Sequence, residues 1–557
     1  MKTRSVGALL FLALPFFTSL GAPSIWDSNE AYYVQTPREM VERGDWLVPY
    51  FNAEPRLNKP PLAYWVVAAF YRGFGASLWG ERLVMAALAY ACLWIIFWIG
   101  RILLFSEPTA VLAAGIFATS FRFLMLSRRL LIDILLLFCV LAAIGCFLHW
   151  LKNGDRKAFL LSSLLFGLGF LAKGPVALLP VAALLLYLLM SGQLARLRSA
   201  PWALATLLFL SVSSSWFLVL GFQMGWEAVS NFMWTENLGR FTHIQFGPAR
   251  GPLFYVGAFI VDYFPWSLLF PGAVLQWLRC RRRRDSKEAD IPSATTGSSG
   301  SDDTTPSGPK ASIELLGCWI LIYFLVFSFS QNKQEYYILP VYPAASLWLA
   351  HYLRRASIGL PVRILIASVS SCLGILLFVL AGSLFSEAWG WWIPFIPFLG
   401  FILLAARGQT EKMVWALCLF YFSVFTLYLG PLDEYRPVHH LARAIQKKAP
   451  PEGTFLAGYY RYSAPSLTYY LNQPILETYR FQEIVDTLRR DSPVYLIMGS
   501  SDYEELRQVV GRRLEIVEVR PNLYTSGREL ITGLKSGRKI SADTWTRPIY
   551  LVSNQGE

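Results

Sequence analysis

The 557-residue sequence is poor in charge: only 16% of its residues are Asp, Glu, Lys or Arg. Soluble globular proteins carry about 25%, so too few polar side chains are present to cover a water-exposed surface of this size. The chain is instead 55% hydrophobic, with a mean hydropathy of +0.41. This abundance of apolar residues excludes an intrinsically disordered chain. The composition therefore excludes an ordinary soluble enzyme and indicates a membrane protein.

Cysteine and histidine are also scarce, with seven and five residues. The cysteines lie in or beside apolar runs and form no CxxC pair, so neither a disulfide framework nor a thiolate zinc site is predicted. The sequence has no glycine-rich phosphate-binding loop and no internal repeat. We expect the cysteines to be small buried hydrophobic residues, and no cofactor is indicated.

The net charge of +13 comes from 50 basic and 37 acidic residues. In a soluble protein this excess would suggest nucleic acid, but in a membrane protein it reports basic cytoplasmic loops beside anionic lipid. The run Arg281 to Arg284 is accordingly interpreted as a stop-transfer cluster. We predict membrane lipid, and no nucleic acid, as a partner.

Long apolar runs recur along the chain and predict transmembrane helices, because about 20 apolar residues cross a bilayer and each segment in lipid has to satisfy its own backbone hydrogen bonds. About 13 spans are expected in this polytopic α-helical protein, and the pair within 158–191 is the least distinct. They lie near 5–22, 81–104, 108–125, 130–149, 158–172, 175–191, 201–222, 253–277, 312–330, 336–353, 362–385, 389–406 and 412–430.

Basic residues orient these spans. With Lys2 and Arg4 in the cytoplasm, every second loop should be cytoplasmic and basic. Those loops carry Arg101, Lys152, Arg156, Lys157, Arg196, Arg198, Arg279, Arg281 to Arg284, Arg354, Arg355, Arg363, Arg407 and Lys412. An odd number of spans then places the C-terminal region in the periplasm. The first span is alternatively a cleaved signal peptide, but Pro23 directly after the candidate cleavage site favours an anchor.

Composition divides the chain into four parts. Residues 1–278 form an N-terminal membrane block with a long first outer loop at 23–80, and residues 312–430 form a second membrane block. Between them, 279–311 contains a Ser/Thr/Gly/Asp-rich stretch typical of a flexible cytoplasmic linker. In 431–557 the helical patterns 439–448 and 503–511 alternate with the strand patterns 454–459, 494–498 and 514–519. This alternation predicts a small C-terminal α/β domain outside the membrane.

The first outer loop is too long for a plain connector and too polar to span. It contains 26-WDSNEAYYVQTPREMVERGDWLVPYFNAEPRLNKPPLAYW-65. In 29–43, Tyr33 and Met40 fall on one helical side and charged residues fall elsewhere, which predicts an amphipathic helix in the interface. After Lys59-Pro60-Pro61 an apolar helix begins, with prolines in its first turn.

The ordered pieces REM-x-x-x-GDW-x-VP and KPP-L-x-YW in this loop resemble the lipid-linked-sugar glycosyltransferases of the GT-C type. The resemblance is to the bacterial aminoarabinose transferases that modify lipid A and to their relatives, the protein O-mannosyltransferases. Further similar pieces follow in the same order and extend the resemblance over about residues 20–345. They are 127-SRRLLIDILLLF, 171-LAKGP, 235-TENLGRF, 262-DYFPWS and 332-NKQEYYILPVYP.

The resemblance implies a GT-C fold and inverting transfer of a sugar from a polyprenyl-phosphate donor to a lipid A-like or protein acceptor on the periplasmic face of the inner membrane. Cations have to stabilise the departing phosphate, and a carboxylate has to take the proton of the acceptor hydroxyl. Candidates for phosphate or donor binding are Lys59, Lys173, Arg240 and Lys333, and candidate catalytic carboxylates are Asp27, Glu30 and Asp133. Weaker candidates for acceptor or sugar contacts are Asn29, Glu236 and Tyr336.

The sequence departs from the family at several of these positions. Asn29 stands where the family has Asp, and an amide cannot act as a base, so Asp27 or Glu30 would have to replace it with Asp133 in support. Tyr32 stands where the aminoarabinose enzyme has an arginine that contacts phosphate. Asn58 and Asn237 stand where it has Glu and His bound to a metal, so we predict that no metal binds here.

Two alternatives remain open. A catalytically inactive member of the family would bind a lipid carrier, and Asn29 favours that hypothesis. A lipid or sugar transporter would need ionisable residues near span centres and inverted repeats, neither of which is evident. The enzyme hypothesis predicts that Asp27 or Glu30 shares a cavity with Lys59 and Asp133.

Overall fold

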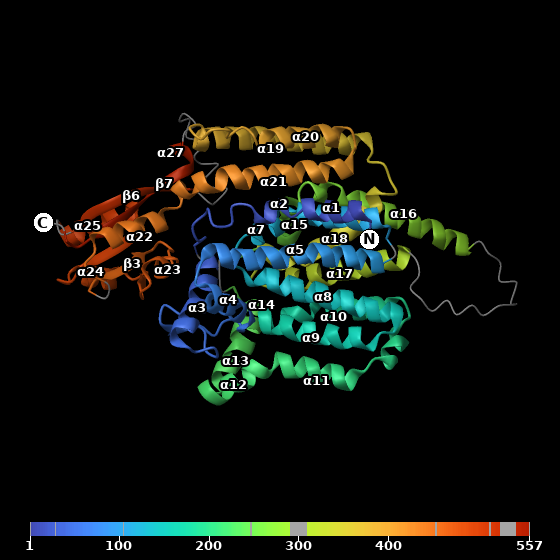
Figure 1. Ribbon diagram of the computed structural model, residues 1–557, viewed down its shortest axis with the longest axis horizontal. Helices are drawn as coiled ribbons and strands as arrows, with labels where there is room; N and C mark the ends of the chain where they lie inside the picture. Colours follow the sequence, from blue (N-terminus) through green and yellow to red (C-terminus); the bar gives the residue numbers. More distant parts are fainter. Residues whose placement is uncertain are drawn as a thin grey trace.

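The computed structural model describes residues 2–27, 29–103, 105–244, 248–289, 309–451, 454–511, 514–523 and 542–555. It consists of a body of elongated helices and a smaller α/β unit built by the C-terminal region (Figure 1). Most helices of the body run along the long axis of the molecule. The N-terminus and helix α16 (Phe270–Ala289) lie at the end of the body that is opposite to the α/β unit.

The body is almost entirely helical, in agreement with the predicted class. Its helices are α1 (Thr3–Phe11), α2 (Leu14–Phe17), α3 (Asn29–Arg43), α4 (Leu62–Phe74), α5 (Leu78–Ile102), α6 (Glu107–Ala118), α7 (Phe121–Leu126), α8 (Ile132–Asn153), α9 (Arg156–Lys173), α10 (Leu179–Met190), α11 (Trp202–Ser213), α12 (Ser215–Met224), α13 (Trp226–Asn231), α14 (Arg240–Thr242), α15 (Phe254–Asp262), α16, α17 (Pro309–Phe329), α18 (Val341–Leu353), α19 (Leu360–Phe385), α20 (Phe395–Ala406) and α21 (Thr410–Leu432).

Six helical segments within the described residues are long and apolar enough to cross a membrane, or eight if each of two bent pairs counts as one span. The stretch Arg156–Met190, which contains both α9 and α10, counts as one of the six. The bent pairs are α11 with α12 and α15 with α16. Other predicted spans correspond to shorter apolar helices such as α6 and α20. The structure therefore has the multi-pass character expected from the sequence, with fewer full-length helices than the 13 apolar runs.

The predicted pair within 158–191 reverses direction at Gly174. Lys173, at the end of α9, contacts Asp133 at the start of α8, whereas Arg196, just after α10, donates to the carbonyl of Leu151 near the end of α8 at 2.7 Å. Helix α9 therefore runs from the C-terminal end of α8 to its N-terminal end, and α10 runs back to the C-terminal end of α8. Gly174 has φ +77°, a conformation that side chains disfavour, and the short helix η1 (Gly174–Leu178) completes the turn.

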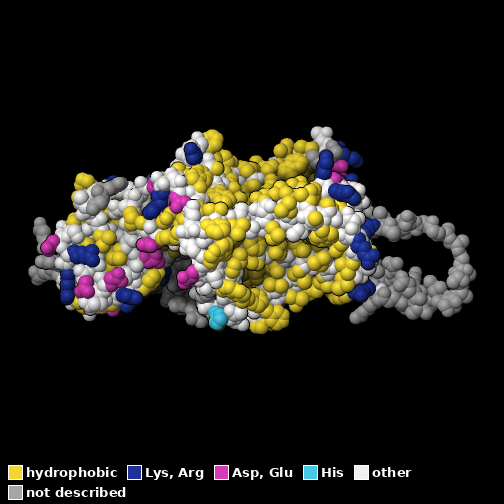
Figure 2. Space-filling view, turned by 90° about the horizontal axis from the view of Figure 1, so that it is seen from below, with side chains coloured by type: hydrophobic (Ala, Val, Ile, Leu, Met, Phe, Trp, Pro, Cys, Tyr) yellow, Lys and Arg dark blue, Asp and Glu magenta, His cyan; other side chains and the backbone are white. Residues whose placement is uncertain are grey.

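The surface of the body is the one expected of a protein in lipid. Hydrophobic side chains cover its flank in a broad band, and Lys and Arg side chains gather at the end opposite to the α/β unit (Figure 2). Leu207, Phe222 and Ile375 are among the exposed apolar residues. A soluble monomer rarely exposes an apolar surface of this extent, so the chain is a multi-pass membrane protein.

The predicted linker 279–311 overlaps the two helices that flank it. Helix α16 continues to Ala289, and α17 begins at Pro309. The intervening residues 290–308, on which the linker prediction mainly rests, lie outside the described residues.

The α/β unit has a five-stranded sheet in the order β4-β3-β5-β7-β6. Its strands are β3 (Leu456–Tyr460), β4 (Leu476–Thr478), β5 (Val494–Gly499), β6 (Glu515–Leu523) and β7 (Thr546–Ser553). Strand β3 pairs in parallel with β4 and β5, and β7 pairs antiparallel with β5 and β6. The predicted strand patterns coincide with β3, β5 and β6.

Helices pack on both faces of this sheet because side chains alternate along each strand. Tyr495 and Ile497 of β5 join a cluster with α22 (Pro437–Lys448) and α23 (Leu467–Leu471). Leu496 and Met498 join a second cluster with α24 (Phe481–Leu488) and α25 (Ser500–Val510). Each face of the sheet therefore has its own hydrophobic core.

The first outer loop lies against the α/β unit. Its hairpin of β1 (Tyr50–Phe51) and β2 (Glu54–Pro55) turns at Asn52. The Asn52 side chain accepts a hydrogen bond from the Ile475 amide at 2.7 Å and donates to the Ile475 carbonyl at 2.9 Å. The carboxylate of Glu39, on α3, accepts from the Asn52 amide at 2.9 Å. Helix α3 and the hairpin thereby fix the segment that carries Lys59.

Candidate functional site

A cavity of about 400 Å³ opens between the start of α8, the end of α9, the π-helix η3 (Phe232–Gly239) and the segment that joins α17 to η5 (Glu335–Ile338). The first outer loop contributes Lys59 to its lining. Six residues predicted from the sequence line this cavity together. They are Lys59, Asp133, Lys173, Glu236, Arg240 and Tyr336.

Two of these residues form a buried ion pair between adjacent helices. Asp133 lies in the first turn of α8, and its carboxylate accepts a hydrogen bond from the ammonium of Lys173. The side chains are only 8% and 12% exposed. The same ammonium lies 5.3 Å and 5.0 Å from the ring centres of Tyr336 and Tyr337, within the range of a cation–π interaction. Lys173 is thus held between one carboxylate and two aromatic rings.

A second ion pair lies within one helical turn. Glu236 on η3 accepts from Arg240, four residues later at the start of α14. The carbonyl of Arg240 accepts from the Asn332 amide at 3.1 Å, and the carbonyl of Phe241 accepts from the Gln331 amide at 2.8 Å. These backbone bonds join the pair to the segment after α17.

Lys59 is the third cation of the cavity. It is half-buried in the outer loop, outside the spanning helices. Burial and the neighbouring cations Arg240 and Lys173 lower the pKa of Lys59 to about 7. An anion that entered the cavity would relieve this repulsion, so Lys59 is well suited to bind one.

Asn332 is a cavity residue to which the sequence analysis gave no role. Its side chain is 1% exposed, it lines the cavity, and neither of its amide atoms has a hydrogen-bond partner among the described residues. Buried polar atoms are usually paired. Asn332 begins the family-like piece 332-NKQEYYILPVYP, but no local pattern indicates its burial, which involves distant residues such as Arg240.

Lys333 lies beside the cavity but is not among its described lining residues. Its ammonium donates to the carbonyl of Ser330, and its own carbonyl accepts from Arg250 at 2.8 Å. Burial lowers the pKa of Lys333. The ammonium is therefore engaged within its own turn of chain.

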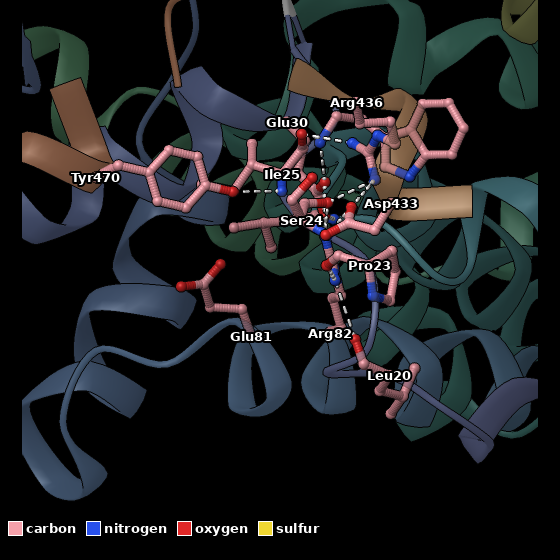
Figure 3. A network of polar contacts seen from close by, with 12 residues as sticks. Leu20, Pro23, Ser24, Ile25, Glu30, Glu81, Arg82, Asp433, Arg436 and Tyr470 are labelled. Carbon is pink, nitrogen blue, oxygen red and sulfur yellow. Dashed lines mark hydrogen bonds and ion pairs between the residues drawn. The ribbon is translucent and has the colours of Figure 1, made fainter. Parts of the chain in front are cut away.

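Glu30 is buried in a separate cluster, the Glu30–Arg82 cluster, shown in Figure 3. Its carboxylate accepts from Arg82 at 2.9 and 3.0 Å, from the Trp26 amide at 2.8 Å and from the Leu130 amide at 3.2 Å. Although burial alone would raise it, the pKa of Glu30 is held below its usual range by Arg82 and these hydrogen bonds. Four donors occupy this carboxylate, which leaves it poorly placed to take a substrate proton.

Arg82, on α5, also donates to three carbonyls of the segment before α3. They belong to Leu20 at 3.0 Å, Pro23 at 2.7 Å and Ser24 at 3.0 Å. From the opposite side, Arg436 donates to the carbonyls of Ser24 at 2.8 Å and Ile25 at 2.5 Å (Figure 3). The segment is thus held between a body helix and the start of the α/β unit. Arg82 was not predicted as a site residue, because its only signal in the sequence is an arginine at the start of a long apolar helix.

Asp27 and Asn29 lie close to this cluster. One oxygen of Asp27 accepts from the Ser466 amide of the α/β unit at 3.0 Å, and burial raises the pKa of Asp27 to about 6. Asn29 begins α3 and is exposed. Asp27, Asn29 and Glu30 are all absent from the described residues that line the cavity. The structure therefore does not bring Asp27 or Glu30 into the space shared by Lys59 and Asp133.

The chain is similar in sequence and in structure to known proteins. A family model described as dolichyl-phosphate-mannose-protein mannosyltransferase matches residues 58–218. An uncharacterized protein of Aquifex aeolicus is 25% identical over 512 residues, covering 91% of this chain and 93% of that protein. The undecaprenyl phosphate-alpha-4-amino-4-deoxy-L-arabinose arabinosyl transferase of Edwardsiella ictaluri is 28% identical over 358 residues, covering 62% of this chain and 59% of that protein.

The match thus spans about three fifths of the arabinosyl transferase. Among solved structures, ArnT from Cupriavidus metallidurans bound to undecaprenyl phosphate superposes with a TM-score of 0.73 at 20% identity, covering 100% of this chain and 98% of that one. The described residues therefore have a fold similar to that of ArnT. The resemblance to GT-C glycosyltransferases that the sequence predicted is confirmed.

Proposed function

We propose that this chain is a membrane glycosyltransferase that moves a sugar from a polyprenyl-phosphate donor to a lipid A-like or protein acceptor at the periplasmic face of the inner membrane. The observation that carries the proposal is the convergence of Lys59, Lys173 and Arg240 with Asp133 and Glu236 in one cavity. With Lys59 protonated, these groups leave one positive charge in excess. A phosphate monoanion fits such a site.

The cations act on the leaving group. As the acceptor oxygen bonds to the anomeric carbon, the bond from that carbon to the phosphate oxygen breaks and negative charge grows on the phosphate. Lys59 and Lys173 stabilise that charge. Because Lys173 is paired with Asp133, a phosphate that attracts Lys173 also loosens its hold on the carboxylate.

We assign to Asp133 the role of receiving the proton of the acceptor hydroxyl, since it is a carboxylate of the cavity next to a cation that the donor engages. Asp27 is the alternative base. Its raised pKa of about 6 suits a base at neutral pH, but an acceptor would have to reach it at the contact with the α/β unit. Glu30, with four donors, is assigned to positioning the loop.

The orientation follows from the distribution of charge. Arg101, Lys152 and Arg198 are exposed at the ends of helices that lie away from the cavity. We place that end in the cytoplasm, since basic loops remain inside, and with it the N-terminus. The cavity and the α/β unit of 431–557 are then periplasmic, and the apolar runs supply about 13 membrane passes in two blocks, 1–278 and 312–430.

Reconstitution tests the function. The full-length chain in lipid nanodiscs is mixed with undecaprenyl-phosphate-linked sugars and lipid A, and the products are identified by mass spectrometry. In parallel, envelope lipids and proteins of a deletion strain are compared with those of the parent. A sugar-modified lipid or protein that is missing from the deletion strain is expected. If no polyprenyl-phosphate compound binds the protein and no envelope component changes, the proposal is wrong.

The exposed amide at Asn29 favours one second candidate, an inactive carrier-binding protein. That protein would bind undecaprenyl phosphate and transfer nothing. Asn29→Asp restores the carboxylate that the family has at this position. The appearance of transfer only in Asn29→Asp would support the inactive form, whereas transfer by the unmodified chain excludes it.

A further inference from the structure

Phosphate binding leaves one polar group of the cavity unexplained. Asn332 lines the cavity and is almost completely buried, yet its Oδ1 and its Nδ2 both lack a partner among the described residues. Burial of an unpaired amide is unfavourable. The side chain is therefore expected to complete its hydrogen bonds with a bound molecule.

The chemistry of an amide limits what that molecule presents. Asn332 offers an acceptor and a donor side by side. A phosphate oxygen only accepts and an ammonium only donates, so neither can satisfy both atoms. Adjacent hydroxyl groups of a sugar each donate and accept, and they match the amide at both atoms.

The charges of the cavity also limit the charge that the sugar of the donor can carry. Asp133 is paired with Lys173, and Glu236 is paired with Arg240. A donor phosphodiester carries one negative charge, which balances the single excess cation. An ammonium on the sugar would have to compete with Lys173 and Arg240 for these two carboxylates, and a buried charge without a partner of its own is strongly disfavoured.

We propose that the donor of this protein carries a neutral, polyhydroxylated sugar whose adjacent hydroxyls bind Asn332, in contrast to the amino sugar in the name of the arabinosyl transferases. The inference rests on the proposed function and names the substrate class of the same cavity. Asn332 is accordingly a specificity-determining residue, whereas Lys59 and Lys173 bind the phosphate that neutral and amino donors share.

Matched ligands test the inference. Binding to the full-length chain in nanodiscs is measured for undecaprenyl phosphate, undecaprenyl-phosphate-arabinose and its 4-amino-4-deoxy form, which replaces one hydroxyl by an ammonium. We expect the neutral arabinose donor to bind at least about tenfold more tightly than the amino form. Asn332→Ala should weaken the neutral donor about tenfold and change the affinity for undecaprenyl phosphate by less than about twofold.

Two further variants keep the test decisive. Gln331→Ala removes the side-chain amide of the neighbouring residue, which is exposed and lies outside the described lining. This variant should leave all three affinities unchanged. Asn332→Asp places an additional carboxylate in the cavity and should shift the preference toward the amino sugar. This gain cannot result from partial unfolding.

Three outcomes overturn the inference. They are preference of the unmodified chain for the amino donor, equal binding of the two donors, and an equal loss for undecaprenyl phosphate and the neutral donor in Asn332→Ala. These results leave the proposed function intact, because undecaprenyl phosphate still binds. Failure of the unmodified chain to bind undecaprenyl phosphate contradicts the proposed function itself, and the inference with it.

Discussion

Two clusters of buried charge, both assembled from distant parts of the chain, differ in how their central groups are paired. Glu30 and Arg82 are saturated with hydrogen bonds, although Oε2 of the neighbouring Glu81 has no partner among the described residues. In the Glu30–Arg82 cluster both side chains are completely buried, and Arg82 donates to Glu30 and to three backbone carbonyls. In the cavity the charges are paired but unbalanced, and Asn332 has no partner among the described residues. Ionisable residues near membrane depth are functional candidates by default. The saturation of Glu30 and Arg82 therefore suits a structural role, and the incomplete pairing in the cavity supports the ligand site that we propose there.

The largest expected effect is on stability, at Arg82. Removing one partner of a buried ion pair leaves the other charge uncompensated and typically costs about 3–5 kcal/mol. Arg82→Ala should lower the free energy of unfolding by this order and also free the loop before α3. Denaturant unfolding of the purified protein in detergent measures the loss.

Glu42→Ala is the matched control, since it removes an exposed ion pair between Glu42 and Arg38. The side chain of Glu42 is 49% exposed. Exposed pairs contribute about 0–1 kcal/mol. If Arg82→Ala and Glu42→Ala have equal free energies of unfolding, the Glu30–Arg82 cluster stabilises the fold no more than an exposed ion pair does.

Arg82→Ala mainly lowers stability, whereas Lys59→Ala should cause a large loss of transfer activity with little change in stability. Under the proposed function Lys59 stabilises the departing phosphate, so its removal is expected to lower the transfer rate by about 10²–10³-fold. Because Lys59 is half-buried and strained by its cationic neighbours, its removal does not strand a buried partner. Transfer rate and melting temperature are measured on the same preparation. If Lys59→Ala has a lower melting temperature but keeps its transfer activity, Lys59 has a structural role and does not act on the phosphate.

The two carboxylate candidates are compared through Asp133→Asn and Asp27→Asn. A general base typically contributes about 10²–10⁴-fold to the rate, and we expect this loss in Asp133→Asn because Asp133 lines the cavity. Asp27→Asn retains an oxygen that can accept from the Ser466 amide and should keep most of its transfer activity. The opposite result would assign the base to Asp27 and would show that the acceptor enters beside the α/β unit.

The sequence predicted much of this arrangement and missed the rest for physical reasons. Apolar runs and alternating patterns are local, so they identified the helical body and strands β3, β5 and β6. Ten candidate residues came from the ordered motifs, and six of them line the cavity together. Glu30 lies outside the described lining of the cavity, and three of its four hydrogen bonds come from Arg82 and Leu130, far away in the chain, so no local pattern could indicate them. Burial of Asn332 is likewise tertiary and has no local signature.

The smallest expected effect is the pH dependence of donor binding. With a pKa of about 7 in the free protein, Lys59 is charged below pH 7 and loses its proton as the pH rises through that value. A bound phosphate favours the charged form and raises the pKa, so donor affinity is full below pH 7 and declines above it, by at most about tenfold per pH unit. The slope is measured by titrating the binding of an undecaprenyl-phosphate-linked sugar, a phosphodiester whose charge is constant in this range, between pH 6 and 9 at constant ionic strength. Lys59→Arg stays charged throughout and should flatten it. A slope that is unchanged in Lys59→Arg would assign the titration to another group and remove Lys59 from the phosphate site.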